Sequence, residues 1–121
     1  MRKKEGRSIR SLVNRRRSRR ATVYMLAGET CGGKYFLPLL ANVSSDGLLL
    51  ECPSGLEMPR RHDAVVELSL PGVDEIIWAR CQLVRESSHG FFRRRALRFV
   101  DISPLHRKQL HMYIQRVCGL C

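Results

Sequence analysis

Two short segments about twenty residues apart hold the side chains best suited to bind an anionic ligand. The first runs from Asn14 to Arg20 and contains five arginines, at positions 15, 16, 17, 19 and 20. A guanidinium group can bind a phosphate through two parallel hydrogen bonds, and it can also bind the O6/N7 edge of guanine. Arg16 and Arg20, four residues apart, can therefore contact both ends of a guanine nucleotide. Taken alone, such a charge run is more often a solvated tail.

The second segment, Asn42–Gly47, is a polar turn between two apolar runs. Asn42 offers a hydrogen-bond donor and an acceptor, and Ser44 offers a hydroxyl, so both can bind a base edge or a phosphate oxygen. Gly47 permits a positive φ or a close approach of the backbone to a ligand. Without the first segment, the same pattern is typical of a turn that closes a hairpin.

The positive charge of the chain is concentrated at its N-terminus. The 121 residues carry a formal net charge of +11, and residues 1–20 hold ten of the 22 basic residues but only one acidic residue, Glu5. Like charges repel, and the segment has little apolar surface to bury, so we expect a flexible arm on a nearly neutral body. A basic arm attracts phosphate-bearing partners of many kinds, so charge alone does not identify the ligand.

The composition disfavours several classes of protein. Residues 1–20 contain no apolar core of a secretory signal, and no run approaches the length of a membrane span. Five cysteines, an odd number, favour reduced thiols in the cytoplasm over a secreted disulfide framework. The Cys118/Cys121 pair lacks a second pair at ligand spacing, so no metal site is expected. No nucleophile–base pair or acidic dyad is visible, so we expect neither an enzyme nor a cofactor.

The body of the chain has the pattern of one all-β domain. Runs rich in β-branched and aromatic residues recur at short intervals. The predicted strands are 21–26, 35–43, 47–52, 64–70, 75–85 and 91–100. Residues 28–33 are predicted to form a turn, and Pro38 indicates an edge or a bulge in its strand. The basic run Arg93–Arg95 is interpreted as a solvated strand end.

A helix follows the last predicted strand. Ser103 is a suitable N-cap, Pro104 suits the first helical position, and Gly119 ends the segment. An apolar stripe at helical spacing is formed by Leu110, Tyr113, Ile114 and Val117. Six strands in short hairpins followed by one amphipathic helix indicate a six-stranded antiparallel β-barrel with the helix packed across its open side.

The two segments, in this order and on this strand pattern, resemble the PilZ domain, the bacterial receptor module for cyclic di-GMP. The family pattern RxxxR matches Arg16–Arg20, and the pattern [D/N]xSxxG matches Asn42–Gly47. The stretch Ala96–Pro104 is similar to the last strand of the family and the start of its C-terminal helix. The resemblance covers residues 14–117. The implied division is therefore a flexible basic arm at 1–13, a PilZ-like barrel at 14–117 and a tail at 118–121.

The resemblance implies a binding site with two halves. Arg16 and Arg20 would contact the phosphates and guanines of cyclic di-GMP, and Asn42, Ser44 and Gly47 would form the barrel side of the pocket. Arg15 is a further candidate, because in similar proteins an arginine just before RxxxR accompanies binding of two ligand molecules. Arg15 and Arg19 form an overlapping frame, which leaves the alignment ambiguous by one residue.

The expected function is that of a cytoplasmic, non-enzymatic receptor whose arm becomes ordered on the ligand and relays the signal to a protein partner. The expected assembly is a monomer or a homodimer. One alternative is a small basic barrel that binds single-stranded nucleic acid, which is disfavoured because no strand face alternates aromatic and basic residues. A second alternative is a PilZ-like adaptor that binds only protein.

Overall fold

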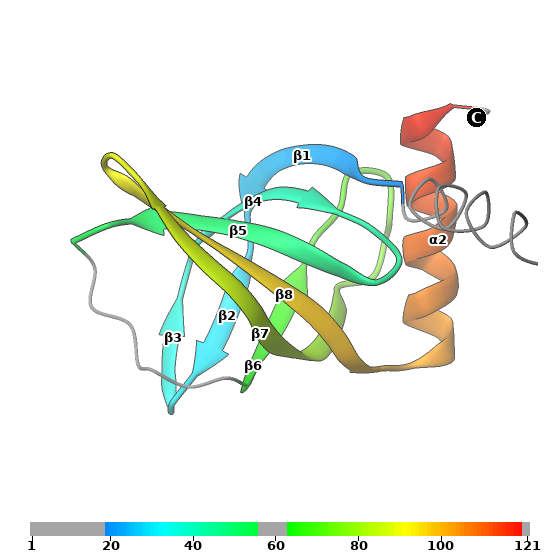
Figure 1. Cartoon of the computed structure of the whole chain (residues 1–121). Coiled ribbons are helices and arrows are strands. Elements are labelled where there is room, and N and C mark those ends of the chain that lie inside the picture. The colour runs from blue at the N-terminus through cyan, green and yellow to red at the C-terminus, as the bar shows by residue number, and fades with distance from the viewer. Residues whose placement is uncertain (1–18, 56–62, 120–121) are drawn as a thin grey trace, which may run out of the picture.

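The structure of the chain, a computed structural model, describes residues 19–55 and 63–119. These residues form a mainly β fold that ends in one helix, α2 (Pro104–Cys118), which confirms the predicted fold class (Figure 1). The strands are β1 (Ala21–Leu26), β2 (Gly28–Cys31), β3 (Lys34–Phe36), β4 (Leu39–Val43), β5 (Gly47–Pro53), β6 (Asp63–Leu68), β7 (Ile77–His89) and β8 (Phe92–Ile102).

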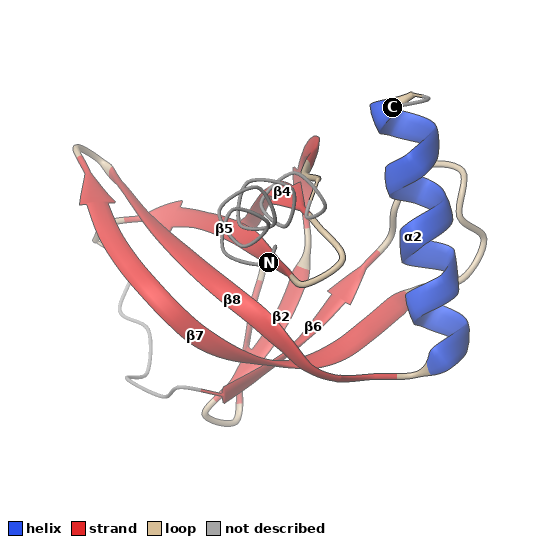
Figure 2. Cartoon of the chain, turned by 45° about the vertical axis from the view of Figure 1, so that its right-hand side comes forward, coloured by secondary structure: helices blue, strands red, loops and turns tan. Residues whose placement is uncertain are grey.

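All of these strands belong to one antiparallel sheet in the order β1-β4-β5-β8-β7-β6-β2-β3. β1 and β2 lie near opposite ends of that order, yet only Ala27 separates them along the chain. A flat sheet cannot satisfy both conditions, so the sheet curls strongly towards a barrel (Figures 1 and 2). The long hairpin of β7 and β8 runs across this curl and projects beyond it.

The first four strands form one long hairpin that is bent in its middle. Its tip is Gly32–Gly33, where both glycines have positive φ angles of 61° and 79°. At the bend, the amide of Ala27 donates to the carbonyl oxygen of Pro38 at 2.9 Å and keeps the two arms paired. On one side of the bend β4 pairs with β5, and on the other side β2 pairs with β6. The two halves of one hairpin thereby join opposite ends of the sheet.

This bend explains why eight strands are present where the sequence predicts six. The predicted strand 35–43 is interrupted at Leu37–Pro38, because proline has no amide proton to donate to a neighbouring strand. The predicted turn at 28–33 is wrong, since 28–31 is β2 and only the tip turns. Gly28 pairs with Glu67 in the sheet, and a side chain at this position would clash with the Tyr35 hydroxyl.

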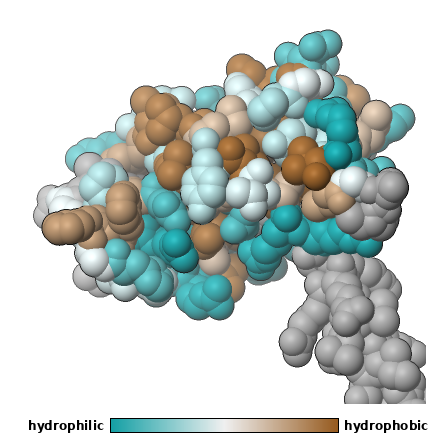
Figure 3. Space-filling model, turned by 90° about the horizontal axis from the view of Figure 1, so that it is seen from above, coloured by the Kyte–Doolittle hydropathy of each residue, from teal (hydrophilic) through white to brown (hydrophobic). Residues whose placement is uncertain are grey.

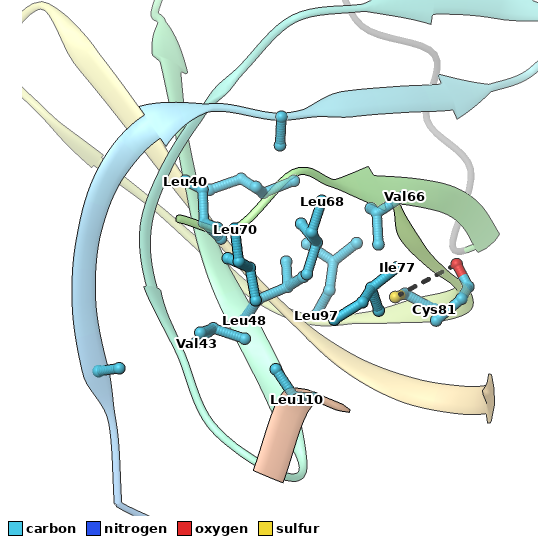
Figure 4. Close-up of a cluster of buried hydrophobic side chains, with 14 of the residues drawn as sticks. Leu40, Val43, Leu48, Val66, Leu68, Leu70, Ile77, Cys81, Leu97 and Leu110 are labelled. Atoms are coloured by element: carbon cyan, nitrogen blue, oxygen red, sulfur yellow. Dashed lines mark hydrogen bonds between the residues drawn. The ribbon is translucent and has the colours of Figure 1, made fainter. Parts of the chain in front are cut away.

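The inward-facing side chains of the curled sheet form the hydrophobic core (Figure 4). Burial alternates along β7: Ile77, Ala79 and Cys81 are buried, whereas Trp78 and Arg80 are exposed. The largest fully buried apolar side chains are Leu40, Leu50, Leu68, Ile77, Leu110, Val43 and Val66. They come from β4, β5, β6, β7 and α2, so the core ties the helix to strands from both sides of the bend.

Helix α2 begins and ends as its sequence predicts. The Ser103 side chain accepts a hydrogen bond from the His106 amide at 3.2 Å, Pro104 opens the helix and Gly119 ends it with a positive φ. Three members of the predicted stripe are buried: Leu110, Tyr113 and Ile114. Val117 is 45% exposed and does not belong to the core. Cys118, partly buried at the end of the helix, packs there instead.

A buried ion pair crosses the interior of the curled sheet. Its arginine, Arg95, is buried, which corrects the expectation that the whole run Arg93–Arg95 is solvated. The Arg95 guanidinium on β8 donates to both carboxylate oxygens of Glu29 on β2, each at 2.8 Å. The side chains of Arg95 and Glu29 are 5% and 0% exposed. β2 and β8 are not adjacent in the sheet, so the pair bridges strands that only the curl brings together.

Burial and the ion pair together change the pKa values of two buried groups, Arg95 and Cys81. Burial acts to lower the pKa of Arg95, but hydrogen bonds to Glu29 and the charge of that carboxylate outweigh it, and the pKa is raised above its usual value. Burial, aided by the same carboxylate, also raises the pKa of Cys81 to about 12. The Cys81 thiol is therefore neutral at physiological pH. Of the described cysteines, Cys52 and Cys81 are buried free thiols.

Within the described ranges, no helix has the length and apolar character needed to cross a membrane.

Substitution of Glu29 by glutamine tests the ion pair. It leaves the Arg95 charge buried without a counter-charge, so we expect the free energy of unfolding to fall by about 3–5 kcal/mol. The matched control is Glu86→Gln, which removes an exposed partner of Arg93 (3.2 Å) and should cost less than about 1 kcal/mol. Urea denaturation of both variants measures the difference. Equal losses in the two variants would show that the buried pair is not a special constraint.

Candidate functional site

Two of the predicted site residues meet directly, although they are 22 positions apart. Arg20 immediately precedes β1, and Asn42 lies on β4, the only strand with which β1 pairs among the described residues. The register pairs Ala21 with Val43 and Thr22 with Asn42. This pairing brings the Arg20 Nη1 atom to 3.3 Å from Asn42 Oδ1, to which it donates a hydrogen bond. The Arg20 side chain is exposed and Asn42 is half-buried, so both remain accessible from solvent.

Ser44 holds the turn between β4 and β5 in shape. Its side chain is nearly buried, with the residue 4% exposed. The hydroxyl oxygen accepts from the amides of Asp46 and Gly47, both at 3.2 Å, and the hydroxyl donates to the Gly47 carbonyl oxygen at 3.3 Å. The interpretation of this serine as a turn-closing residue is therefore correct. Its hydroxyl is fully used inside the turn.

Gly47 is required by the packing of β5 on β8. A Cβ atom at this position would clash with the Leu97 carbonyl oxygen and lie 3.0 Å from the Arg98 Cα atom. Its φ is not in the left-handed region, so conformational freedom is not the reason for glycine. The turn is also fixed to β8 by a hydrogen bond from the Phe99 amide to the Asp46 carbonyl oxygen at 2.9 Å. The close approach predicted for this glycine is thus an approach to the chain's own β8.

Arg98 is a neighbour of this turn that the sequence analysis did not single out. It pairs with Gly47 across β5 and β8, and its guanidinium donates to Gln82 Oε1 on β7 at 2.8 Å. The period-two pattern of β8 places Arg98 on the outer face, but only the strand order places it beside the turn. The face of the molecule seen from above mixes apolar and polar side chains (Figure 3). Exposed apolar residues on β1 include Tyr24 and Leu26.

A cleft of about 230 Å³ lies between the β4–β5 turn and helix α2. It is lined by Arg19, Ser45, His111, Ile114 and Gln115. Arg19 belongs to the arginine cluster and Ser45 lies within the Asn42–Gly47 motif, so both predicted segments reach this cleft. Figure 1 shows the turn between β4 and β5 extending towards α2.

The end of helix α2 also contacts the first half of the site. The Cys118 thiol donates to the Arg20 carbonyl oxygen at 3.9 Å. The predicted site residues Arg15 and Arg16 lie outside the described residues, as does Cys121. No group of three metal-binding side chains occurs within residues 19–55 and 63–119.

Both predicted segments lie within the part of the chain that matches a known protein family. The family model described as the PilZ domain matches residues 14–116, which include both predicted segments. No curated protein matches the chain.

Several solved structures share the fold. The inhibitor of motility MotI/DgrA of Bacillus subtilis superposes with a TM-score of 0.70 at 17% identity, covering 80% of this chain and 48% of that one. The PilZ domain of YcgR from Escherichia coli, solved with c-di-GMP, gives a TM-score of 0.63 at 18% identity and covers 85% and 91%. The PlzA protein of Borreliella burgdorferi, in complex with c-di-GMP, gives 0.61 at 13% identity and covers 92% and 57%. The chain thus spans about half the length of the MotI/DgrA and PlzA chains.

A Gly47→Ala variant tests the structural role of the second segment. The added methyl group meets backbone atoms of β8 that cannot move without disturbing the β5–β8 pairing, so we expect a loss of about 1–3 kcal/mol in unfolding free energy. Gly55→Ala is the matched control, because no atom lies within 4 Å of the added Cβ, and its effect should stay within about 0.5 kcal/mol. Urea denaturation measures both. A Gly47→Ala variant as stable as Gly55→Ala would contradict this account.

Proposed function

Because the chain belongs to the PilZ domain family, we propose that it is a non-enzymatic receptor for cyclic di-GMP. The ligand would lie between the arginine cluster, through Arg16 and Arg20, and the outer surface of the barrel at Asn42–Gly47. Arg15 would contribute if two ligand molecules bind. The PilZ domain of YcgR and the PlzA protein, which share the fold, were solved with this ligand.

The observation that carries the proposal is the hydrogen bond between Arg20 and Asn42. Two segments that are separate in the sequence form one surface, which combines an exposed cation with an amide. The guanidinium can form paired hydrogen bonds with a phosphate or with the O6/N7 edge of guanine, and the amide can bind another base edge. A dianionic ligand carrying two guanines matches this combination of groups.

The contacts of Ser44 and Gly47 support an indirect part for both residues in the proposed binding. The Ser44 hydroxyl is occupied by the turn, and Gly47 lets the turn approach β8. Both residues therefore preserve the backbone shape on which Asn42 and Ser45 are presented to a ligand. Loss of either residue should weaken binding through the shape of the turn.

We further propose that the signal is the ordering of the N-terminal arm. Residues 1–20 carry ten basic residues and one acidic residue, and the bound phosphates would neutralise part of this charge. Arg20 links the arm to β1, so a ligand held there would fix the arm against the barrel. A protein partner would then recognise the ordered arm.

An adaptor that binds only protein is the second candidate. The contacts in the β4–β5 turn are compatible with it. Since Ser44 and Gly47 are needed for folding, a barrel that binds no ligand would retain both. Arg19 and Arg20, the described arginines of the first segment, are exposed, so substitution of Arg20 separates the two candidates.

Calorimetric titration with cyclic di-GMP tests the receptor function. We expect saturable binding that weakens at least tenfold in Arg20→Ala, which loses a charge-assisted contact worth about 1.5–3 kcal/mol. Ser44→Ala should also weaken binding. Arg80→Ala is the charge-matched control, because Arg80 is an exposed arginine on β7 that lines other clefts. The affinity of this variant for cyclic di-GMP should match that of the wild type. A stoichiometry of two that falls to one in Arg15→Ala would assign Arg15 its role.

The same titration distinguishes the alternatives. Absence of heat with a folded wild-type protein would remove the receptor function and favour the adaptor. Absence of heat together with salt-sensitive binding to single-stranded DNA or RNA would favour the nucleic-acid barrel.

Limited digestion with trypsin tests the ordering of the arm. We expect saturating cyclic di-GMP to slow cleavage within residues 1–20 several-fold in the wild type, because an arm docked on the barrel is a poor protease substrate. Arg20→Ala at the same ligand concentration is the control and should show weaker protection, because it binds the ligand less tightly. Identical cleavage rates with and without bound ligand would show that the signal is not carried by the arm.

A further inference from the structure

Helix α2 presents a polar pair to the cleft beside the motifs. His111 and Gln115 are four residues apart, so they lie on the same face of the helix one turn from each other. Both are exposed, whereas Ile114 between them is only 7% exposed and belongs to the core. The helix thus gives the cleft an apolar floor with two polar side chains above it.

The opposite side of the cleft comes from the two motif segments. Arg19 supplies a guanidinium from the arginine cluster, and Ser45, half-buried, lies in the β4–β5 turn. An apolar floor with a small number of polar side chains around it is a feature of pockets that bind small organic molecules. Within the described residues, this is a cleft that joins both motif segments to α2.

The volume limits what the cleft can hold. Pockets for a whole drug-sized molecule are about 300–1,000 Å³, and this cleft measures about 230 Å³. It is therefore too small for an entire cyclic dinucleotide but suits a single base. Guanine fits the lining chemically, because an arginine can bind its O6 and N7 atoms, an amide oxygen can accept from its N1 and N2 groups, and an imidazole can stack on its face.

We propose that helix α2 forms a third wall of the ligand site, and that one guanine of the cyclic dinucleotide enters the cleft between Arg19 and the His111/Gln115 pair. This inference rests on the proposed function, since it extends the same site. Gln115 binds the edge of the base, His111 packs on its face, and Ile114 forms the floor. Neither motif segment contains these helix residues.

The test is calorimetric titration of a His111→Ala/Gln115→Ala double variant with cyclic di-GMP. We expect affinity to fall at least tenfold, because two contacts with the base are lost. Two controls are matched to the variant. Met112→Ala changes an exposed residue on the same helical turn that does not line the cleft, and His89→Ala removes an exposed histidine in the distant β7–β8 hairpin. Both controls should bind within twofold of the wild type.

The outcomes separate this inference from the function on which it rests. No binding by the folded wild type removes the proposed function. Wild-type binding that is lost in Arg20→Ala but unchanged in the double variant overturns only the role of the helix. A second measurement needs no variant: bound cyclic di-GMP should slow modification of His111 by diethyl pyrocarbonate, read by mass spectrometry, and leave His89 unaffected. Equal modification of His111 with and without ligand would also overturn the inference.

Discussion

The bend in the first hairpin, at Ala27 and Pro38, is the constraint from which the rest of the fold follows. It sends one half of the hairpin to β5 and the other half to β6, and the continuity of the chain then forces the sheet to curl. The curl creates the interior in which Glu29 meets Arg95 across strands that are not neighbours. The same hairpin pairs β1 with β4, and this pairing brings Arg20 to Asn42.

Two kinds of arginine in this chain differ only in their surroundings. Arg95 is buried and held by both oxygens of one carboxylate, so its charge belongs to the folding of the barrel. Arg19 and Arg20 are exposed, and Arg20 has a neutral amide as its hydrogen-bond partner. A neutral partner leaves the charge available to an anion. The fold therefore uses Arg95 in its interior, whereas Arg19 and Arg20 stay exposed to solvent.

The second motif combines residues that shape the turn with residues that remain accessible from solvent. Ser44 and Gly47 shape the turn and its contact with β8, whereas Asn42 and Ser45 retain exposure towards solvent. A short polar motif can thus persist for structural reasons alone. Arg19 and Arg20, the described residues of the arginine segment, are both exposed, and for this reason they are the more informative test of ligand binding.

The sequence by itself determined the class of fold, the strand at 75–85, the caps of helix α2 and the two motif segments, because these depend on local periodicity and on the chemistry of single residues. It misjudged 28–33, where a glycine in a strand looks like a turn, and it assigned Arg95 to solvent. The tertiary structure decided the strand order, the Glu29–Arg95 pair, the neighbours of Gly47 and the cleft on α2. These features depend on contacts between distant segments, and the strand order and the curl of the sheet together determine which distant side chains meet.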